Sequence, residues 1–124
     1  MEEIKVAGET AQFIVIRLGQ EQYGIDISYI ENIVRMQHIT RVPKLAPYLK
    51  GVINLRGEVI PIMCLSMKMG LPVEEETKAS RIIIIKMEQC GTLGLIVDEV
   101  KEVVTLDMTE QVEKLAFKKE DKSN

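Results

Sequence analysis

The chain has little of the side-chain chemistry on which enzymes and metal sites depend. Its 124 residues include one histidine, His38, and two cysteines, Cys64 and Cys90, which lie far apart and form no CxxC pair. A single histidine excludes an HExxH motif and any zinc site with two histidine ligands. The sequence also lacks a Walker loop and a GxGxxG motif, so specific nucleotide binding has no visible basis. We therefore expect no enzyme, no cofactor and no bound metal.

Long apolar runs and an excess of basic charge are missing as well. The longest purely apolar run of the strand-like segments, residues 82–85, is far too short to span a bilayer. The first residues are acidic and lack the basic-then-apolar pattern of a signal peptide. The net charge is -3, and no basic stripe carries interleaved aromatic residues, which argues against nucleic acid as a partner. These features predict a cytoplasmic protein with reduced thiols.

What the chain does contain is an internal repeat. After Gly24 and after Gly94, large apolar residues recur at matching positions. They are Ile25, Ile27, Ile30, Ile33 and Val34 in the first copy, and Leu95, Val97, Val100, Val103 and Val104 in the second. The offset exceeds the roughly 20–50 residues of solenoid repeats, so it favours two related small subdomains.

Turn residues divide each copy into short strands. Residues 13–18 and 23–27 predict a strand, a turn and a second strand, and the chain repeats this pattern from residue 81. The i, i+3, i+7 spacing of Ile27, Ile30 and Val34 predicts a short helix next, with an equivalent helix in the second copy.

A further hairpin is predicted over residues 51–62. Gly57 in its turn is expected to adopt a positive φ, and Pro61 indicates an edge strand or a bulge. One helical turn is expected at 66–70 and another helix at 108–116. Many short strands with few helices indicate a mainly β fold of small barrels.

The second copy stops before its own closing hairpin. Its equivalent of residues 51–62 would begin near the charged tail at 117–124, which has no strand pattern. We expect one domain, with a first unit at about 12–72 and a partial second unit at about 80–116. Strand edges left open in this way predict a homodimer, a strand swap or marginal stability, and the run at 82–85 adds to that hazard.

Two kinds of residue are candidates for binding a partner. Arg56 lies in a turn between apolar strands, where an arginine either recognises a partner or is simply solvated. The apolar residues of the two expected helices, among them Ile30 and Val100, belong either to the core or to a groove between the units.

Several segments together resemble the CheW-type chemotaxis coupling proteins. The most specific is residues 50–57, Lys-Gly-Val-Ile-Asn-Leu-Arg-Gly; others are residues 13–18, 23–27, 59–62 and 94–100. The resemblance covers roughly residues 12–110. It implies two five-stranded SH3-like β-barrels that share a hydrophobic seam. It also implies a non-enzymatic adaptor that links the cytoplasmic tips of chemoreceptors to the histidine kinase CheA, whose regulatory domain has the same fold.

By this resemblance, the receptor-binding surface lies in the groove between the subdomains. Its candidate residues here are Ile30, Asn32, Arg56, Val97 and Val100. Barrel ends are similar to the kinase-binding surfaces, without assigned residues. Family members often carry a glutamate where Asn32 stands, and on a helix Glu31 would point about 100° away from that position. An ion pair between Arg56 and this segment is therefore not expected.

Two other functions stay open on the sequence alone. A shortened paralogue could bind the kinase or the receptor without productive coupling, which a pull-down with the kinase regulatory domain would test. A small-ligand-binding regulatory module is the second, and a thermal shift with purine nucleotides would test it.

Overall fold

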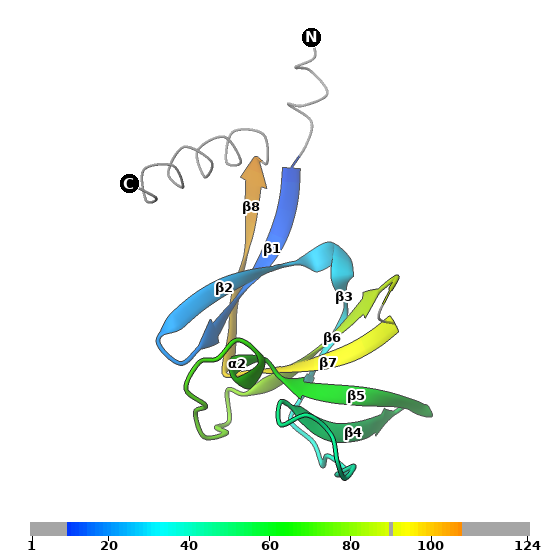
Figure 1. The fold of residues 1–124 in the computed structure, drawn as a ribbon. Helices are drawn as coiled ribbons and strands as arrows, with labels where there is room; N and C mark the ends of the chain where they lie inside the picture. The colour runs from blue at the N-terminus through cyan, green and yellow to red at the C-terminus, as the bar shows by residue number, and fades with distance from the viewer. Residues whose placement is uncertain (1–9, 90, 108–124) are drawn as a thin grey trace.

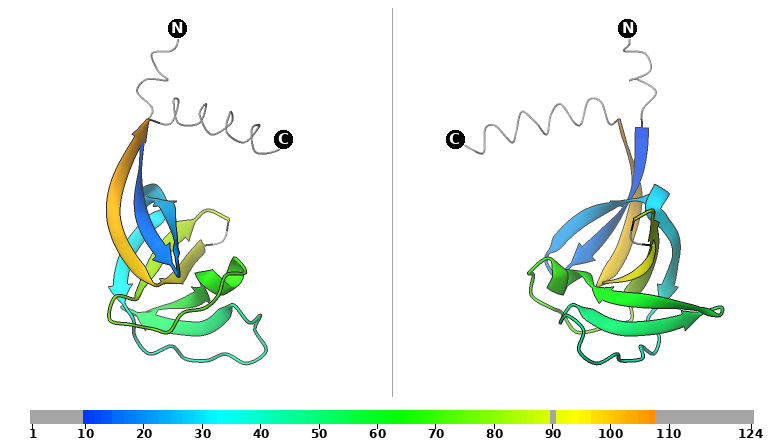
Figure 2. Two further views of the ribbon diagram at one scale, coloured as in Figure 1. Left: turned by 90° about the vertical axis from the view of Figure 1, so that its left-hand side faces the viewer. Right: turned by 45° about the vertical axis from the view of Figure 1, so that its right-hand side comes forward.

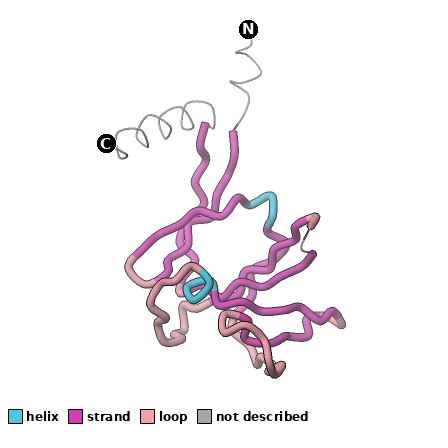
Figure 3. The backbone as a smooth tube through the Cα atoms, viewed as in Figure 1, coloured by secondary structure: helices cyan, strands magenta, loops and turns pink. Residues whose placement is uncertain are grey.

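Strands dominate the computed structural model, which describes residues 10–89 and 91–107. The helical elements of these residues are two short turns, and strands make up most of the backbone in Figure 3. The mainly β fold predicted from the sequence is therefore confirmed. No helix in the described part of the chain is long and apolar enough to cross a membrane. The predictions for Cys90, for a helix at 108–116 and for a polar tail at 117–124 lie outside the described residues.

The strands form two sheets (Figure 1). In chain order the elements are β1 (Thr10–Leu18), β2 (Glu21–Asp26), the 3₁₀ turn η1 (Ile27–Tyr29), β3 (Ile30–Arg35), β4 (Leu49–Leu55), β5 (Glu58–Cys64), α2 (Leu65–Lys68), β6 (Arg81–Met87), β7 (Gly91–Val97) and β8 (Glu99–Asp107). One sheet has the order β2-β1-β8, and the other has the order β3-β6-β7-β5-β4. Each sheet draws strands from both repeat units, so the two units are interleaved in space. The start of β1 and the end of β8 lie side by side and project away from the five-stranded sheet in every view (Figure 2).

The five-stranded sheet closes on itself. Thr40, a few residues beyond the end of β3, forms an isolated antiparallel bridge with Val52 of β4. Both backbone bonds of this bridge are short, with N···O distances of 2.8 Å and 2.9 Å. Because β3 and β4 are the two outer strands of this sheet, the bridge joins its edges into a small barrel.

The interior of this barrel is filled by branched aliphatic side chains. The buried members are Ile53, Ile60, Ile62, Ile82 and Ile84. Gly94 leaves room for them: a Cβ atom there would lie 2.6 Å from Ile62 Cδ1 and 2.9 Å from Ile82 Cγ2. Close packing thus favours glycine at position 94.

A second core lies between the barrel and the three-stranded sheet. Its buried members are Ile16, Leu18, Ile83, Ile85, Leu95 and Val97. Strand β6 serves both cores, since Ile82 and Ile84 face the barrel interior while Ile83 and Ile85 face the other sheet. An apolar run without alternation is what a strand covered on both faces requires. The prediction that 82–85 adds an aggregation hazard is therefore wrong, because β6 lies between β3 and β7 and these side chains are buried.

The short helix predicted from Ile27 is confirmed only as the single 3₁₀ turn η1, because β3 begins at Ile30. The helix predicted in the second copy is wrong, because β8 occupies that segment. Each strand contains a β-bulge: the register of β3 on β6 shifts between Ile30 and Asn32, and that of β8 on β1 shifts opposite Ile14 and Ile16. An extra residue puts Ile30 and Ile33 on the same face although they are three positions apart. The spacing that indicates a helix is thus produced by a bulge.

Pro61 is neither in an edge strand nor at a bulge. It lies opposite Val52, whose N–H and C=O both bond to Thr40 and so point away from β5. The nitrogen of Pro61 consequently faces β7, and β5 pairs with β7 only from Ile62 onward. The N–H that proline lacks would therefore lie before the first residue of β5 that pairs with β7, so no hydrogen bond between these strands is lost. The other local predictions, a positive φ at Gly57 and one helical turn near residue 66, are confirmed.

A set of polar contacts ties the β1–β2 turn to the corner between β7 and β8. Asp98 Oδ2 accepts a hydrogen bond from Gly19 N at 2.6 Å. Arg17 Nε donates to Glu99 Oε1 at 3.0 Å, and Arg17 Nη1 donates to Gly19 O at 3.0 Å. The hydrogen bond from Arg17 and the charge of Lys101 lower the pKa of Glu99.

Candidate interaction surface

The β4–β5 hairpin places Arg56 at its tip. Leu55 pairs with Glu58, so the loop consists of Arg56 and Gly57 alone. Their φ values are +54° and +86°, as in a type I′ turn. The side chain of Asn54 supports the turn, since its Oδ1 accepts a hydrogen bond from Gly57 N at 3.0 Å.

The turn itself does not explain an arginine at position 56. Asparagine, aspartate or glycine is favoured where a two-residue loop requires a positive φ, and other residues are uncommon there. Arg56 is exposed, and its guanidinium makes no hydrogen bond or ion pair with any described residue. A residue held in an unfavourable backbone conformation with a free side chain is a candidate for recognition.

Arg56 borders a hollow of about 320 Å³ at one end of the barrel. The residues that line it come from β3, the β4–β5 hairpin and β6: Glu31, Asn32, Leu55, Arg56, Glu58, Ile60 and Ile84. Ile60 and Ile84 belong to the barrel interior and are almost fully buried. The hollow therefore has an apolar floor and a rim with both signs of charge.

The bulge in β3 brings two consecutive residues to this rim. Glu31 is the extra residue of the bulge, and both Glu31 and Asn32 line the hollow. The expectation that Glu31 points about 100° away is wrong, because it assumed a helix. Asn32 Oδ1 accepts from Ile33 N at 2.8 Å, and Glu31 Oε2 lies 3.7 Å from Lys86 Nζ.

The structure brings only two of the five predicted binding residues together. Asn32 and Arg56 line the same hollow. Val97 has 0% of its surface exposed and belongs to the core between the sheets. Ile30 and Val100 are half-buried against that same core. Val97 is therefore part of the core and not of an exposed groove, whereas a binding role for Ile30 and Val100 stays a prediction.

Glu31, Leu55 and Glu58 were missed by reasoning from the sequence. Leu55 and Glu58 could have been found, because the strands flanking a two-residue turn put both residues beside it. Glu31 could not, since nothing in the sequence distinguishes a bulge from a helix at that point. Among the described residues, no group of three or more His, Cys, Asp or Glu side chains could hold a metal ion.

Comparisons with known proteins agree on one family. The family model "CheW-like domain" matches residues 12–123. The chemotaxis protein CheW of Bacillus subtilis is 39% identical over 99 residues, which cover 80% of this chain and 63% of that protein. The chemotaxis protein CheW of Klebsiella aerogenes is 36% identical over 107 residues, covering 82% of this chain and 62% of that protein. The chain thus spans slightly less than two thirds of the length of these relatives.

A solved structure gives the same result. The scaffolding protein TtCheW from Thermoanaerobacter tengcongensis superimposes with a TM-score of 0.77 at 36% sequence identity. The match covers 82% of this chain and 68% of that chain. The arrangement of the two sheets is therefore shared with a scaffolding protein.

Proposed function

Because the chain belongs to the family of CheW-like domains, we propose that it is a non-enzymatic adaptor that couples the cytoplasmic tips of chemoreceptors to a CheA-type histidine kinase. The names of its relatives, chemotaxis proteins and a scaffolding protein, support this function. The adaptor works by holding two partners at once. Modules held in an array gain effective concentration, so each single contact can be weak.

The observation that carries the proposal is the conformation of Arg56. Its backbone has a φ of +54° and its guanidinium has no partner in the described part of the chain. A free guanidinium presents several N–H donors in a fixed fork, which suits carboxylate or carbonyl oxygens of another protein. The adjacent hollow offers Leu55 and the floor residues for an apolar side chain of that partner.

The proposed contact surface accordingly differs from the set of five candidates. Arg56 and Asn32 remain in it, and Glu31, Leu55 and Glu58 join them as residues of the same hollow. Ile30, Val97 and Val100 are assigned to packing between the sheets. A hairpin tip or helix end of the receptor is the occupant that we propose for the hollow.

The test separates binding from folding with two substitutions at one position. Arg56→Ala should keep the free energy of unfolding within about 0.5 kcal/mol of the original. It should weaken capture of the receptor tip or the kinase regulatory domain about tenfold, or about 1.4 kcal/mol. Arg56→Asn should weaken capture in the same way and make the turn more stable, because asparagine tolerates a positive φ.

Each result can be measured on purified partners, with immobilised receptor fragment or kinase domain and thermal unfolding of the same samples. Unchanged capture by both variants would contradict the role of Arg56. Absence of capture by the original chain with either partner would contradict the adaptor function itself. Capture without any effect on kinase activity would favour the alternative of a paralogue that binds without coupling.

A further inference from the structure

Two arginines face each other across neighbouring strands. Arg35 ends β3, Arg81 begins β6, and the two are direct partners in the register. Directly opposed residues of antiparallel strands have Cβ atoms about 4.5–5.5 Å apart, and like charges there are destabilising. The opposition of the two charges does not by itself stabilise the fold.

The internal repeat supplies the comparison for this position. In the other sheet, the pair related to Arg35 and Arg81 is Thr105 and Gln12. There Gln12 Nε2 donates to Thr105 Oγ1 at 3.5 Å, which makes a neutral cross-strand contact. A neutral pair thus fits these two cross-strand positions, so the strand pairing does not explain a positive charge at Arg35.

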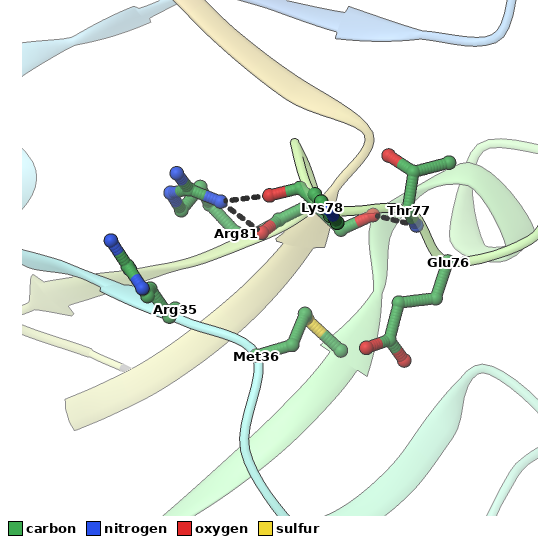
Figure 4. Close-up of a pocket in the computed structure, with 7 residues that line it drawn as sticks. Arg35, Met36, Glu76, Thr77, Lys78 and Arg81 are labelled. Carbon is green, nitrogen blue, oxygen red and sulfur yellow. Dashed lines mark hydrogen bonds between the residues drawn. The ribbon is translucent and has the colours of Figure 1, made fainter.

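The two arginines lie beside a hollow of about 470 Å³, lined also by Met36, Glu76, Thr77, Lys78 and Ser80 (Figure 4). Arg81 Nη1 donates to the carbonyl oxygens of Lys78 at 2.7 Å and Ser80 at 2.8 Å, so this guanidinium is held in place. Arg35 makes no side-chain hydrogen bond or ion pair with a described residue. In Figure 4 the guanidinium groups lie on one side of the hollow, and Glu76 lies on the other side beyond Met36.

We propose that Arg35 and Arg81 bind a carboxylate side chain of an acidic protein segment. A carboxylate between them would offset their repulsion and accept hydrogen bonds from both guanidinium groups. A glutamate side chain suits the hollow better than inorganic phosphate, which has no apolar part to pack against Met36. Met36 offers apolar surface for the methylene groups of an incoming glutamate. This hollow shares no lining residue with the one beside Arg56, so the proposal stands apart from the adaptor function.

The experiment follows the arginine side chains directly. The 124-residue chain, labelled with ¹⁵N, is titrated with a hexaglutamate peptide while the Nε–Hε resonances are recorded. Saturable shifts are expected at Arg35 and Arg81, and Arg35→Gln should reduce the affinity at least tenfold. Arg41→Gln is the matched control, because Arg41 is an exposed arginine that does not line this hollow. The affinity of this variant for hexaglutamate should equal that of the original chain.

Two further measurements keep the proposal open to refutation. Inorganic phosphate should bind more weakly than hexaglutamate, and tighter binding of phosphate would overturn the assignment to a carboxylate. Arg35→Gln should melt at the same or a higher temperature, since it removes a like-charge contact. A lower melting temperature would make Arg35 a structural residue and overturn the proposal, as would an affinity for hexaglutamate that Arg35→Gln leaves unchanged.

Discussion

The five-stranded and the three-stranded sheets are built from the same repeat, yet within residues 10–107 as far as they are described, only the first closes into a barrel. In the first, β3 and β4 are joined by the bridge between Thr40 and Val52, and the interior is filled by isoleucine. In the second, β1 lies between β2 and β8, and neither outer strand has another neighbour among the described residues. The difference shows that the repeated pattern specifies strands and their packing faces, whereas closure depends on the additional β4–β5 hairpin.

The pairing between the copies is reciprocal. The third strand of the first copy, β3, pairs with β6, which is the first strand of the second copy. The third strand of the second copy, β8, pairs in turn with β1, the first strand of the first copy. The hairpin then adds to β7 through a short parallel contact. The strand equivalent to β7 is β2, so the open edge of β2 corresponds to the place where the hairpin docks in the barrel.

The largest expected effect is a loss of stability when a methyl group is added at one of the two equivalent glycines, Gly94. Gly94→Ala should lower the free energy of unfolding by about 1–3 kcal/mol, because its Cβ would overlap Ile62 and Ile82 inside the closed barrel. Gly24→Ala is the matched control: its Cβ would lie 3.4 Å or more from Phe13, an ordinary contact. Chemical denaturation of both variants measures the difference. Equal losses of stability would mean that the two sheets are packed alike.

A charge placed at Ile30 tests the seam between the sheets. Ile30→Asp should lower the free energy of unfolding by about 1 kcal/mol or more, because a carboxylate would be partly buried against the core. Glu31→Lys, one residue away at the bulge, should change it by no more than about 0.5 kcal/mol. If Ile30→Asp unfolds like the original chain but no longer captures the receptor, Ile30 belongs to a binding surface after all.

The open edge of the three-stranded sheet should be visible as self-association. Strand β8 contains a bulge and the charged residues Lys101 and Glu102, features that discourage pairing with another chain. The segment 22–25 of β2 has neither, so we expect it to pair with a second copy and form a dimer. Light scattering over a range of concentrations measures this association, and Gln22→Lys should shift the chain toward the monomer. A monomer at high concentration without that substitution would refute the expectation.

The smallest effect concerns the ion pair that joins β1 to β8. The pKa of Glu99 is lowered in the folded chain, first by its hydrogen bond from Arg17, and so Glu99 stabilises the fold above its ordinary pKa of 4.5. This contribution is lost as the pH falls through the lowered pKa. Glu99→Gln should therefore melt slightly lower than the original chain at pH 7, and the difference in melting temperature should narrow as the pH falls below 4.5. A difference that does not change with pH would assign the effect to packing.

The repeat, the strand composition and the turn at Arg56 could be predicted from the sequence because each depends on local patterns. The bulges in β3 and β8 could not: they produce a spacing of three between apolar residues, and a helix gives the same spacing. The role of Val97 was also out of reach, since only the strand order shows that β7 lies between β6 and β5. Arg56 and Asn32 line one hollow only because the barrel closes. That closure depends on contacts between distant parts of the chain, which local sequence patterns do not predict.

The reciprocal pairing of β3 with β6 and of β8 with β1 governs how the chain can fold. Thr10 of β1 pairs with Asp107 of β8, so the three-stranded sheet cannot be completed until the chain has been synthesised through β8. Contacts between distant parts of a chain form only after a long loop has closed, and this closure costs conformational entropy. Folds that depend on such contacts therefore fold slowly. Neither copy can finish alone, because each lacks the strand that the other supplies. We therefore expect a single cooperative folding step that follows the synthesis of β8. Until that step, β1 and β2 stay accessible to chaperones.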